Sequence, residues 1–381
     1  MVWMEKSTVS LRQEFVLLAS QEGANKRELC RRFGISPKTG YKWLARASDG
    51  LQAVLTDRSR RPHTSPARSP ETTEQAVLAL RGEHPAWGGR KIARRLADLG
   101  QAQLAPSTVT HILHRHGLIT PQASRAAQPW QRFEHDAPNS LWQIDFKGHF
   151  ATIAGRCHGL TLLDDHSRFN LLLGALSRTD AASVQARLIE VFRLYGLPLR
   201  INADNGAPWG SPSAGGRSLS ELAIWLIRLG VRVSFSAPYH PQTNGKLERF
   251  HRSLGVEVIA GQHFRDHASV QCAFDAWRQT YNCERPHEAL QMTVPAQHYR
   301  ASILGYPEHL KEIEYPSTDI VVTVGWNGFI RFRGHTLRTS TALHRLPIGI
   351  RPHLGRDGVH DVYFCHQLFM QIDLHALRAG G

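Results

Sequence analysis

The sequence predicts a multidomain chain with two all-α units at the N-terminus, an α/β domain built on a mixed sheet, and a small β-barrel at the C-terminus. Three observations support this order. The 381 residues are 41% apolar, which is enough for two to four packed domains. Apolar residues first recur at helical spacing, and near residue 141 they give way to strands that alternate with helices. After residue 306 short strands and turn residues dominate, a pattern typical of a small barrel.

The charge balance predicts a polyanionic partner. Lys and Arg number 46 against 32 Asp and Glu, a formal net charge of +14, and residues 1–138 alone hold 21 basic and 12 acidic side chains. A membrane partner is not expected, because no apolar run of about 18 residues and no signal-peptide pattern occur. Five scattered cysteines without a C-x-x-C pair favour a reducing cytoplasm and argue against structural zinc. The chain also lacks a GxxxxGKS or GxxxxGKT loop, which argues against an ATP-driven machine.

Residues 1–56 are predicted to form a helix-turn-helix domain. Asn25, with a glutamate three residues later, predicts a capped helix that Gly34 ends. Ser36 and Pro37 start the next helix as its N-cap and first residue. Two short helices joined in this way form a helix-turn-helix, whose second helix enters the major groove of DNA. The expected contacts on that helix are Lys38, Thr39, Lys42 and Arg46; a helical hairpin with a solvated basic face is the alternative.

Two predicted linkers enclose a second unit of the same kind. Residues 57–70 are rich in Arg, Pro and Ser, and this composition is typical of a linker. Its expected DNA contacts are Arg58, Arg60 and Arg61; a plain solvated linker is the alternative. Residues 71–119 hold three predicted helices in the order of a second helix-turn-helix domain. The expected DNA contacts there are Lys91, Arg94, Ser107, Thr108 and His111. Residues 120–138 are the second linker.

Residues 139–305 are predicted to form the α/β domain. The expected strands cover residues 141–146, 157–163, 169–173, 199–202 and 231–235. The expected helices cover residues 181–195, 219–229 and 245–259. Successive strands followed by strands that alternate with helices predict a mixed sheet. In the last segment, 306–381, the expected barrel strands are 320–324, 329–332 and 335–338.

Three acidic residues of the α/β domain stand at chemically suggestive positions. Asp145 lies in an otherwise apolar strand, Asp204 ends a strand before an Asn-Gly turn, and Glu248 lies in the first turns of a helix. Taken singly, they could be a strand-end acid, a turn residue and an ion-pair partner of Arg252. Together they would form a hard oxygen site suited to Mg²⁺ or Mn²⁺. Such ions can activate a water or hydroxyl and stabilise the leaving oxygen of a phosphodiester.

Five stretches of the α/β domain carry a more specific pattern: 142–147 (WQIDFK), 164–168 (DDHSR), 203–206 (ADNG), 240–254 (HPQTNGKLERFHRSL) and 281–290 (YNCERPHEAL). In this order the chain resembles a DDE transposase of the bacterial insertion-sequence type, closest to the IS481 group, with an integrase-like catalytic core. The resemblance implies an RNase H-like fold. It also assigns Asp145, Asp204 and Glu248 as the catalytic and metal-binding triad, with Mg²⁺ as the cofactor and Mn²⁺ as a substitute.

The sequence departs from this pattern in two places. Between Asp204 and Glu248 lie 43 residues, more than integrase cores usually have, and the extra length is expected in a loop-like run over 209–216. Glu257 is the next acid along the same helix, but its flanks do not match the family. The His-His-Cys-Cys zinc module of retroviral integrases is also missing, and helix-turn-helix units occupy its place, so no zinc is expected.

Further side chains of the core have expected roles. Lys246, Arg249 and Arg252 lie along one helix and are expected to hold DNA phosphates, with a solvated helix face as the alternative. His240, Asn244 and Asn205 could orient the scissile phosphate or the metal ligands. The stretch that contains Tyr281, Arg285, Pro286 and His287 is expected to support the fold as a packed turn.

The resulting hypothesis is a transposase in the bacterial cytoplasm, associated with the nucleoid. It would bind the terminal repeats of its element, cleave a strand to expose a 3′-hydroxyl, and join that hydroxyl to target DNA. Its partners would be double-stranded DNA and further copies of the chain, in a homodimer or higher oligomer. The alternatives are a non-catalytic DNA-binding protein and a nuclease that cuts without rejoining.

Overall fold

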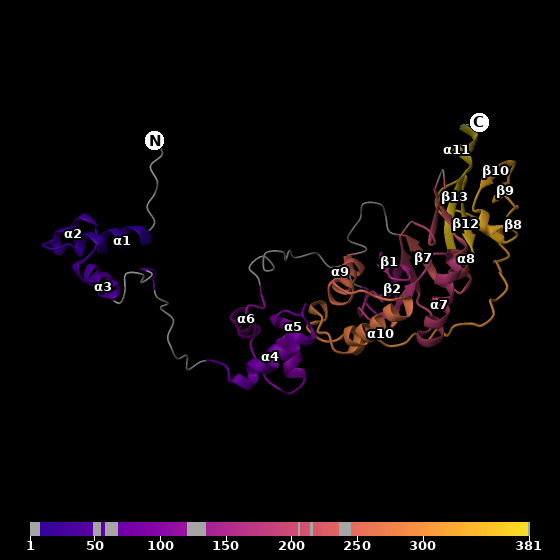
Figure 1. Ribbon diagram of the computed structural model, residues 1–381. Helices are drawn as coiled ribbons and strands as arrows, with labels where there is room; N and C mark the ends of the chain where they lie inside the picture. The colour runs from indigo at the N-terminus through magenta and orange to yellow at the C-terminus, as the bar shows by residue number, and fades with distance from the viewer. Residues whose placement is uncertain are drawn as a thin grey trace. The chain divides into compact units, whose positions relative to one another are not determined.

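The structure, a computed structural model, describes residues 8–48, 55–57, 68–119, 135–204, 206–213, 216–235 and 245–379 (Figure 1). The chain divides into two compact units, Met1–Arg68 and Ser69–Gly381, which are described separately. Six residues with an expected role lie outside the described residues: Arg58, Arg60, Arg61, Asn205, His240 and Asn244.

The first unit is a set of three helices, α1 (Thr8–Ala19), α2 (Lys26–Arg32) and α3 (Pro37–Ala47). The predicted caps are confirmed, since Asn25 Oδ1 accepts a hydrogen bond from Glu28 N at 3.1 Å and Ser36 Oγ accepts one from Thr39 N at 3.2 Å. The helices enclose a small core with Phe15, Ala19 and Cys30 at its centre. Gly40 makes their close approach possible, because a Cβ at that position would lie 2.5 Å from Cys30 Sγ.

The second unit begins with another three helices, α4 (Glu71–Glu83), α5 (Gly89–Asp98) and α6 (Pro106–Arg115). They have an apolar core of their own, made by Val77, Leu80, Trp87, Ile92, Ala93, Leu96, Val109, Ile112 and Leu113. The buried Glu74 carboxylate is satisfied by Arg115, whose guanidinium lies 2.8 Å away. A buried carboxylate is costly unless it is paired in this way, so the pair fixes the end of α6 against α4.

The α/β domain contains the predicted mixed sheet. Its strands are β1 (Trp142–Thr152), β2 (Gly155–Asp164), β3 (Asn170–Leu176), β4 (Arg200–Ala203) and β7 (Arg232–Phe235), in the order β3-β2-β1-β4-β7. The first three strands are antiparallel neighbours, whereas β4 runs parallel to β1 and β7 runs parallel to β4. The end of β4 therefore lies beside the first residues of β1, because Trp142 and Gln143 are the partners of Ile201 and Asn202.

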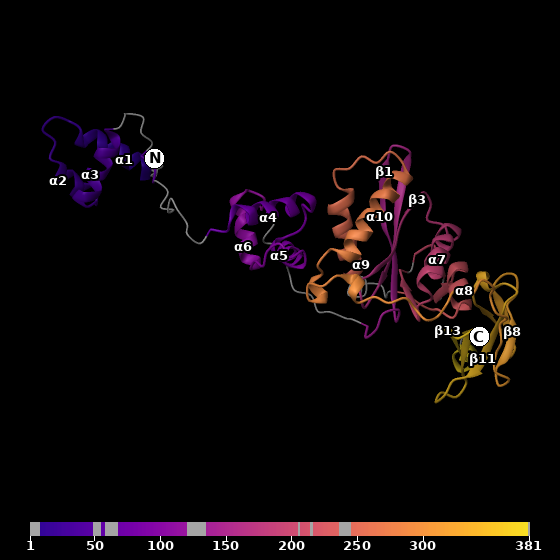
Figure 2. The same ribbon diagram turned by 90° about the horizontal axis from the view of Figure 1, so that it is seen from below.

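Helices cover both faces of this sheet (Figure 2). On one face, α7 (Ala181–Tyr195) and α8 (Glu221–Arg228) pack on the side chains that include Trp142 and Ile144. On the other face lie α9 (Gly245–Leu254), which continues as the π-helix η3 (Gly255–Ile259), and α10 (His267–Cys283). The sequence analysis did not predict α10. It expected a loop over 209–216, but the structure has a hairpin of β5 (Gly210–Ser213) and β6 (Gly216–Leu219).

Short 3₁₀ turns, η4 (Glu288–Leu290) and η5 (Pro295–Gln297), lead from α10 towards the C-terminal segment. That segment holds the three predicted strands β8 (Ile320–Thr323), β9 (Phe329–Phe332) and β10 (His335–Arg338), followed by a 3₁₀ turn, three strands and a helix that were not predicted. These are η6 (Thr341–Leu343), β11 (Pro347–Pro352), β12 (Val359–Phe364), β13 (Gln367–Asp373) and α11 (Leu374–Ala379).

The predicted β-barrel is not confirmed. Within the described residues, the strands form an open sheet in the order β13-β12-β11-β8 and a separate hairpin of β9 and β10. A barrel requires its edge strands to pair with each other, and β13 and β8 stay at opposite edges. The segment instead packs against the α/β domain, where Ser340 Oγ donates a hydrogen bond to Leu219 O at 2.6 Å. No helix in the described part of the chain is long and apolar enough to cross a membrane.

Candidate active site

Asp145 lies on β1 with its side chain on the face that α9 covers. The carboxylate is half-buried and accepts a hydrogen bond from Phe146 N at 2.8 Å. The pKa of Asp145 is raised to about 6, mainly by burial and also by the nearby carboxylates of Asp204 and Glu248, while the hydrogen bond from Phe146 N acts in the opposite direction. The three predicted acids therefore lie within electrostatic range of one another.

The position of Asp204 follows from the sheet register. Strand β4 pairs with β1 in parallel, with Trp142 opposite Ile201 and Gln143 opposite Asn202. Continuing this register places Asp204, directly after β4, beside Asp145. Its side chain is exposed, and Oδ1 accepts a hydrogen bond from Gly206 N at 3.0 Å.

Glu248 is the third acid of the predicted triad and lies on a helix rather than on the sheet. It lies in the first turn of α9, is exposed, and comes from a helix that contacts β1. Among the described residues, no group of three or more His, Cys, Asp or Glu side chains is already drawn together at the spacing of a metal site. Carboxylate oxygens are the donors that hard divalent cations prefer, and burial together with the charges of Asp204 and Glu248 raises the pKa of Asp145 in the absence of such an ion.

A neutral histidine lies one turn beyond Glu248. His251 is buried, and its Nε2 lies 3.1 Å from Thr161 Oγ1 on β2. Thr161 is the partner of Asp145 in the β1–β2 register. Burial lowers the pKa of His251 to about 4, with a smaller contribution from the charge of Lys147, so the imidazole is uncharged at neutral pH. The sequence analysis assigned no role to this residue, although its spacing from Glu248 places both on neighbouring turns.

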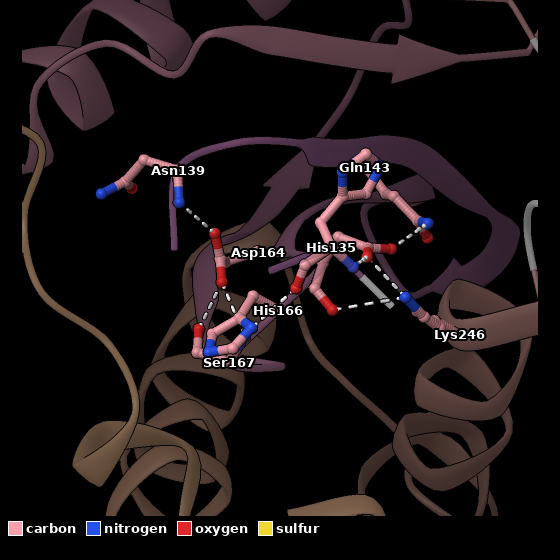
Figure 3. A network of polar contacts seen from close by, with 8 residues as sticks. His135, Asn139, Gln143, Asp164, His166, Ser167 and Lys246 are labelled. Carbon is pink, nitrogen blue, oxygen red and sulfur yellow. Dashed lines mark hydrogen bonds and ion pairs between the residues drawn. The ribbon is translucent and has the colours of Figure 1, made fainter. Parts of the chain in front are cut away.

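Another acidic residue, Asp165, forms a buried polar network with Gln143, His135 and Lys246, whose positions Figure 3 shows. Its Oδ2 lies 2.5 Å from Lys246 Nζ, and the two side chains are 3% and 17% exposed. Its Oδ1 accepts a hydrogen bond from Gln143 Nε2 at 2.8 Å, and His135 N donates to Oδ2 at 3.1 Å. Lys246 is expected from the sequence to contact DNA, and this stays a prediction; in the structure its ammonium contacts this buried carboxylate.

The neighbouring Asp164 fixes the turn between β2 and β3 (Figure 3). Its Oδ1 accepts hydrogen bonds from Ser167 N at 2.7 Å and Ser167 Oγ at 2.6 Å, and its Oδ2 accepts one from Asn139 N at 2.8 Å. His166 Nδ1 lies 2.7 Å from His135 O. These contacts fix the DDHSR stretch as a polar turn. Its two acidic side chains therefore bind neighbouring residues of the protein.

The remaining residues of α9 and the adjoining π-helix differ in exposure. Arg249 and Arg252 are exposed, and Arg249 forms an ion pair of 2.9 Å with Glu288. Glu257 lies in a buried ion pair of 2.8 Å with Arg285 and accepts a hydrogen bond from Trp277 Nε1. Glu257 is thus committed to holding α10, and Arg285 takes part in a packed turn as expected.

The helices of the first unit present part of the expected DNA surface. On α3, Lys38 and Lys42 are exposed. Thr39 is half-buried, and its hydroxyl lies 2.9 Å from Ser36 Oγ. Arg46 is half-buried with its guanidinium 4.8 Å from the centre of the Trp43 ring. Lys38 and Lys42 are therefore the side chains that are most available to a phosphate.

In the second unit, α5 faces the α/β domain. Lys91 is half-buried, and its pKa is lowered to about 8, mainly by burial and also by the nearby charge of Arg285. Arg95 forms an ion pair of 2.6 Å with Glu284, whereas Arg94 pairs with Asp98 on its own helix at 2.8 Å. Whether Lys91 and Arg94 contact DNA stays a prediction. On α6, Ser107 and His111 are exposed and Thr108 is half-buried.

Family comparisons match both parts of this architecture. Residues 135–241 and 229–295 each match a model described as an integrase core domain. Residues 11–63 match a helix-turn-helix domain, and residues 39–113 match a homeodomain-like domain. The chain therefore carries an integrase core domain together with helix-turn-helix domains.

Two of the relatives are proteins of insertion elements. The chain is 27% identical over 161 residues to the "Insertion element IS407 uncharacterized 31.7 kDa protein" of Burkholderia multivorans, over 42% of this chain and 55% of that protein. It is 26% identical over 160 residues to the "Insertion element IS476 uncharacterized 39.2 kDa protein" of Xanthomonas euvesicatoria, over 42% of this chain and 44% of that protein. The chain thus spans about half the length of these relatives, and the more specific IS481 grouping is not confirmed.

The solved structures to which the chain was matched include that of the HTLV-2 integrase catalytic core domain in complex with magnesium. It is 15% identical in sequence, covers 43% of this chain and 99% of its own, and has a TM-score of 0.32.

Proposed function

We propose that this protein is a transposase that binds the terminal repeats of its own insertion sequence, cleaves a DNA strand there and transfers the new 3′-hydroxyl to target DNA. The observation that carries the proposal is the meeting of Asp145, Asp204 and Glu248 within an integrase core domain. A chain that only bound DNA would not need two carboxylates placed where they raise the pKa of a third.

The three acids supply the site for a divalent cation. Mg²⁺, or Mn²⁺ in its place, would lower the barrier by stabilising charge on the scissile phosphate and on the attacking oxygen. Asp145 would give up its proton readily when that ion is present, because its raised pKa arises from burial and from the two neighbouring carboxylates. The neutral His251 would add no positive charge to compete with the cation.

The exposed basic and polar side chains would hold the DNA. Arg249 and Arg252 lie on the outer side of α9, within two turns of Glu248, and would contact phosphates near the cleavage point. Lys38 and Lys42 on α3, with Ser107 and other exposed side chains of α6, would read the terminal repeat. Because both ends of the element must be held together for transposition, we propose a dimer or higher oligomer on DNA.

Strand transfer tests the proposal directly. Purified protein would be incubated with Mg²⁺ or Mn²⁺, a labelled duplex of the element's own end and a target plasmid, beside the Asp204→Ala variant. Joined products from the wild type only are expected.

The two alternatives predict other results in the same assay. Tight end binding without nicking or joining would replace the proposal with a DNA-binding protein. Nicked DNA without joined products would indicate a nuclease.

A further inference from the structure

A buried carboxylate outside the triad connects the two segments that carry Asp145 and Glu248. Asp165 is 2% exposed and follows directly on β2. Its two oxygens contact different elements, since Oδ1 binds Gln143 on β1 at 2.8 Å and Oδ2 lies 2.5 Å from Lys246 on α9. One side chain thus bridges the central strand and the helix that lies over it (Figure 3).

The positions of the two partners along the chain give this bridge a role beyond packing. Gln143 precedes Asp145 by two residues on β1, so the two side chains lie on the same face of the sheet. Lys246 precedes Glu248 by two residues and lies in the same first turn of α9. The bridge is therefore anchored two residues from a triad acid at each end.

The chemistry of the bridge favours a single geometry. A buried carboxylate is stable only while its oxygens are satisfied, and Asp165 has an ammonium, an amide and the backbone N–H of His135 as donors. The Lys246 ammonium also contacts the backbone oxygen of Asp165 at 3.4 Å, so it is held by two groups of one residue. Loss of the Lys246 ammonium would leave the Asp165 carboxylate buried without its charge partner, which is costly.

We infer that the bridge of Gln143, Asp165 and Lys246 sets the separation of Asp145 and Glu248, and that Lys246 and Asp165 are positioning residues for the divalent cation. This inference rests on the proposed function, in which the triad holds that ion. Residues that orient metal ligands typically change metal affinity by about 10–100-fold when they are removed.

Cation binding by the full-length chain is the first readout. The midpoint of thermal unfolding would be measured against Mg²⁺ concentration, and the part of the stabilisation that Asp204→Ala abolishes is assigned to the triad. Lys246→Met is expected to raise the Mg²⁺ concentration of half-maximal stabilisation about tenfold or more. Lys246→Arg, which keeps a cation beside Asp165, should recover most of the affinity.

Strand transfer is the second readout, and its dependence on Mg²⁺ should shift by the same factor. Gln143→Leu keeps the size of the side chain and removes only the amide, so it should fold and shift the midpoint in the same direction by a smaller factor. It keeps the test open if Lys246→Met does not fold.

The matched control is a buried ion pair of similar exposure that contacts the same helix farther from Glu248, since Arg285 Nη2 donates to Ser253 Oγ on α9 at 3.0 Å. Arg285 and Glu257 are 2.8 Å apart with side chains 8% and 10% exposed. Arg285→Met should lower the unfolding temperature and leave the Mg²⁺ midpoint unchanged.

The outcomes separate the two proposals. If the wild-type protein joins DNA and both Lys246→Met and Gln143→Leu keep its Mg²⁺ midpoint, the positioning role is overturned. The proposed transposase function would then still stand. A wild type that neither responds to Mg²⁺ nor joins DNA would overturn the proposed function and this inference with it.

Discussion

Asp145 shows how one residue connects burial, charge and chemistry. Its carboxylate is half-buried on a strand whose neighbours are apolar, and burial is the main reason why its pKa rises to about 6. The folded protein therefore binds a proton on Asp145 more tightly than the unfolded chain, whose ordinary value is 3.8. Ionisation opposes folding, so the cation-free protein should lose stability as pH rises from about 4 to about 6.

This sign gives a pH-dependent prediction for cation binding. Mg²⁺ needs the ionised carboxylate, so the rise in unfolding temperature caused by Mg²⁺ should be larger at pH 7.5 than at pH 5. Asp145→Asn cannot ionise and should lose most of this difference. Thermal unfolding with and without Mg²⁺ at the two pH values measures it, and an equal Mg²⁺ effect at both would contradict the assignment of Asp145 as a ligand.

Gly206 is a second residue with a sharp consequence. A Cβ at this position would lie 3.3 Å from Asp204 Oδ2, closer than most real contacts, so Gly206→Ala should displace the carboxylate. We expect a loss of Mg²⁺ affinity of about tenfold with unchanged binding to DNA ends. Gly82→Ala on α4 is the control, because a Cβ there meets nothing within 4 Å. Equal Mg²⁺ titrations of Gly206→Ala and the wild type would refute the expectation.

At the scale of elements, local signals in the sequence were sufficient for most of the fold. Asn25 and Ser36 cap the helices that they were expected to cap, and α7 spans Ala181–Tyr195 as predicted. The pattern could not show that the last strands form an open sheet, because closure depends on pairing between distant strands. It also missed α10, although the local signal was present: Val270, Phe274, Trp277 and Tyr281 recur at helical spacing and Asp266 caps the helix.

The site was predicted in the same uneven way. The three acids were singled out because each occupies an unusual local position, and whether they bind a metal stays a prediction. Lys246 and Lys91 were expected to face DNA because they are basic residues on predicted helices. Their actual surroundings, Asp165 for Lys246 and the charge of Arg285 for Lys91, come from residues 81 and 194 positions away in the chain. No local pattern reports such long-range partners.

The contact between α5 and the α/β domain is open to an element-scale test. Arg95→Glu would place two carboxylates together at Glu284, where the structure has an ion pair of 2.6 Å, and should lower the free energy of unfolding by about 1 kcal/mol. The double variant Arg95→Glu with Glu284→Arg restores opposite charges and should recover most of that loss. Urea unfolding measures both, and additive losses in the double variant would show that the pair does not hold α5 on the domain.

At the scale of the whole molecule, the formal net charge of +14 and the helix-turn-helix domains both support the proposed binding of DNA. Binding should weaken steeply with salt, because each phosphate contact releases counterions. Lys42→Ala on α3 removes one exposed contact and should reduce the slope of log affinity against log salt concentration by about 0.9. A salt titration of end binding measures this slope, with Glu14→Ala on α1 as a control that removes no positive charge.

The central claim is that Asp145, Asp204 and Glu248 form the catalytic site for DNA joining. The most direct measurement is strand transfer by Asp145→Asn beside the wild type, with end binding measured on the same preparations in Mg²⁺. Joined products are expected from the wild type, and about a thousandfold fewer from the variant, which is on the order of what losing an essential catalytic group costs. Both proteins should bind the element end with equal affinity. Joining by Asp145→Asn at the wild-type rate would contradict the triad assignment.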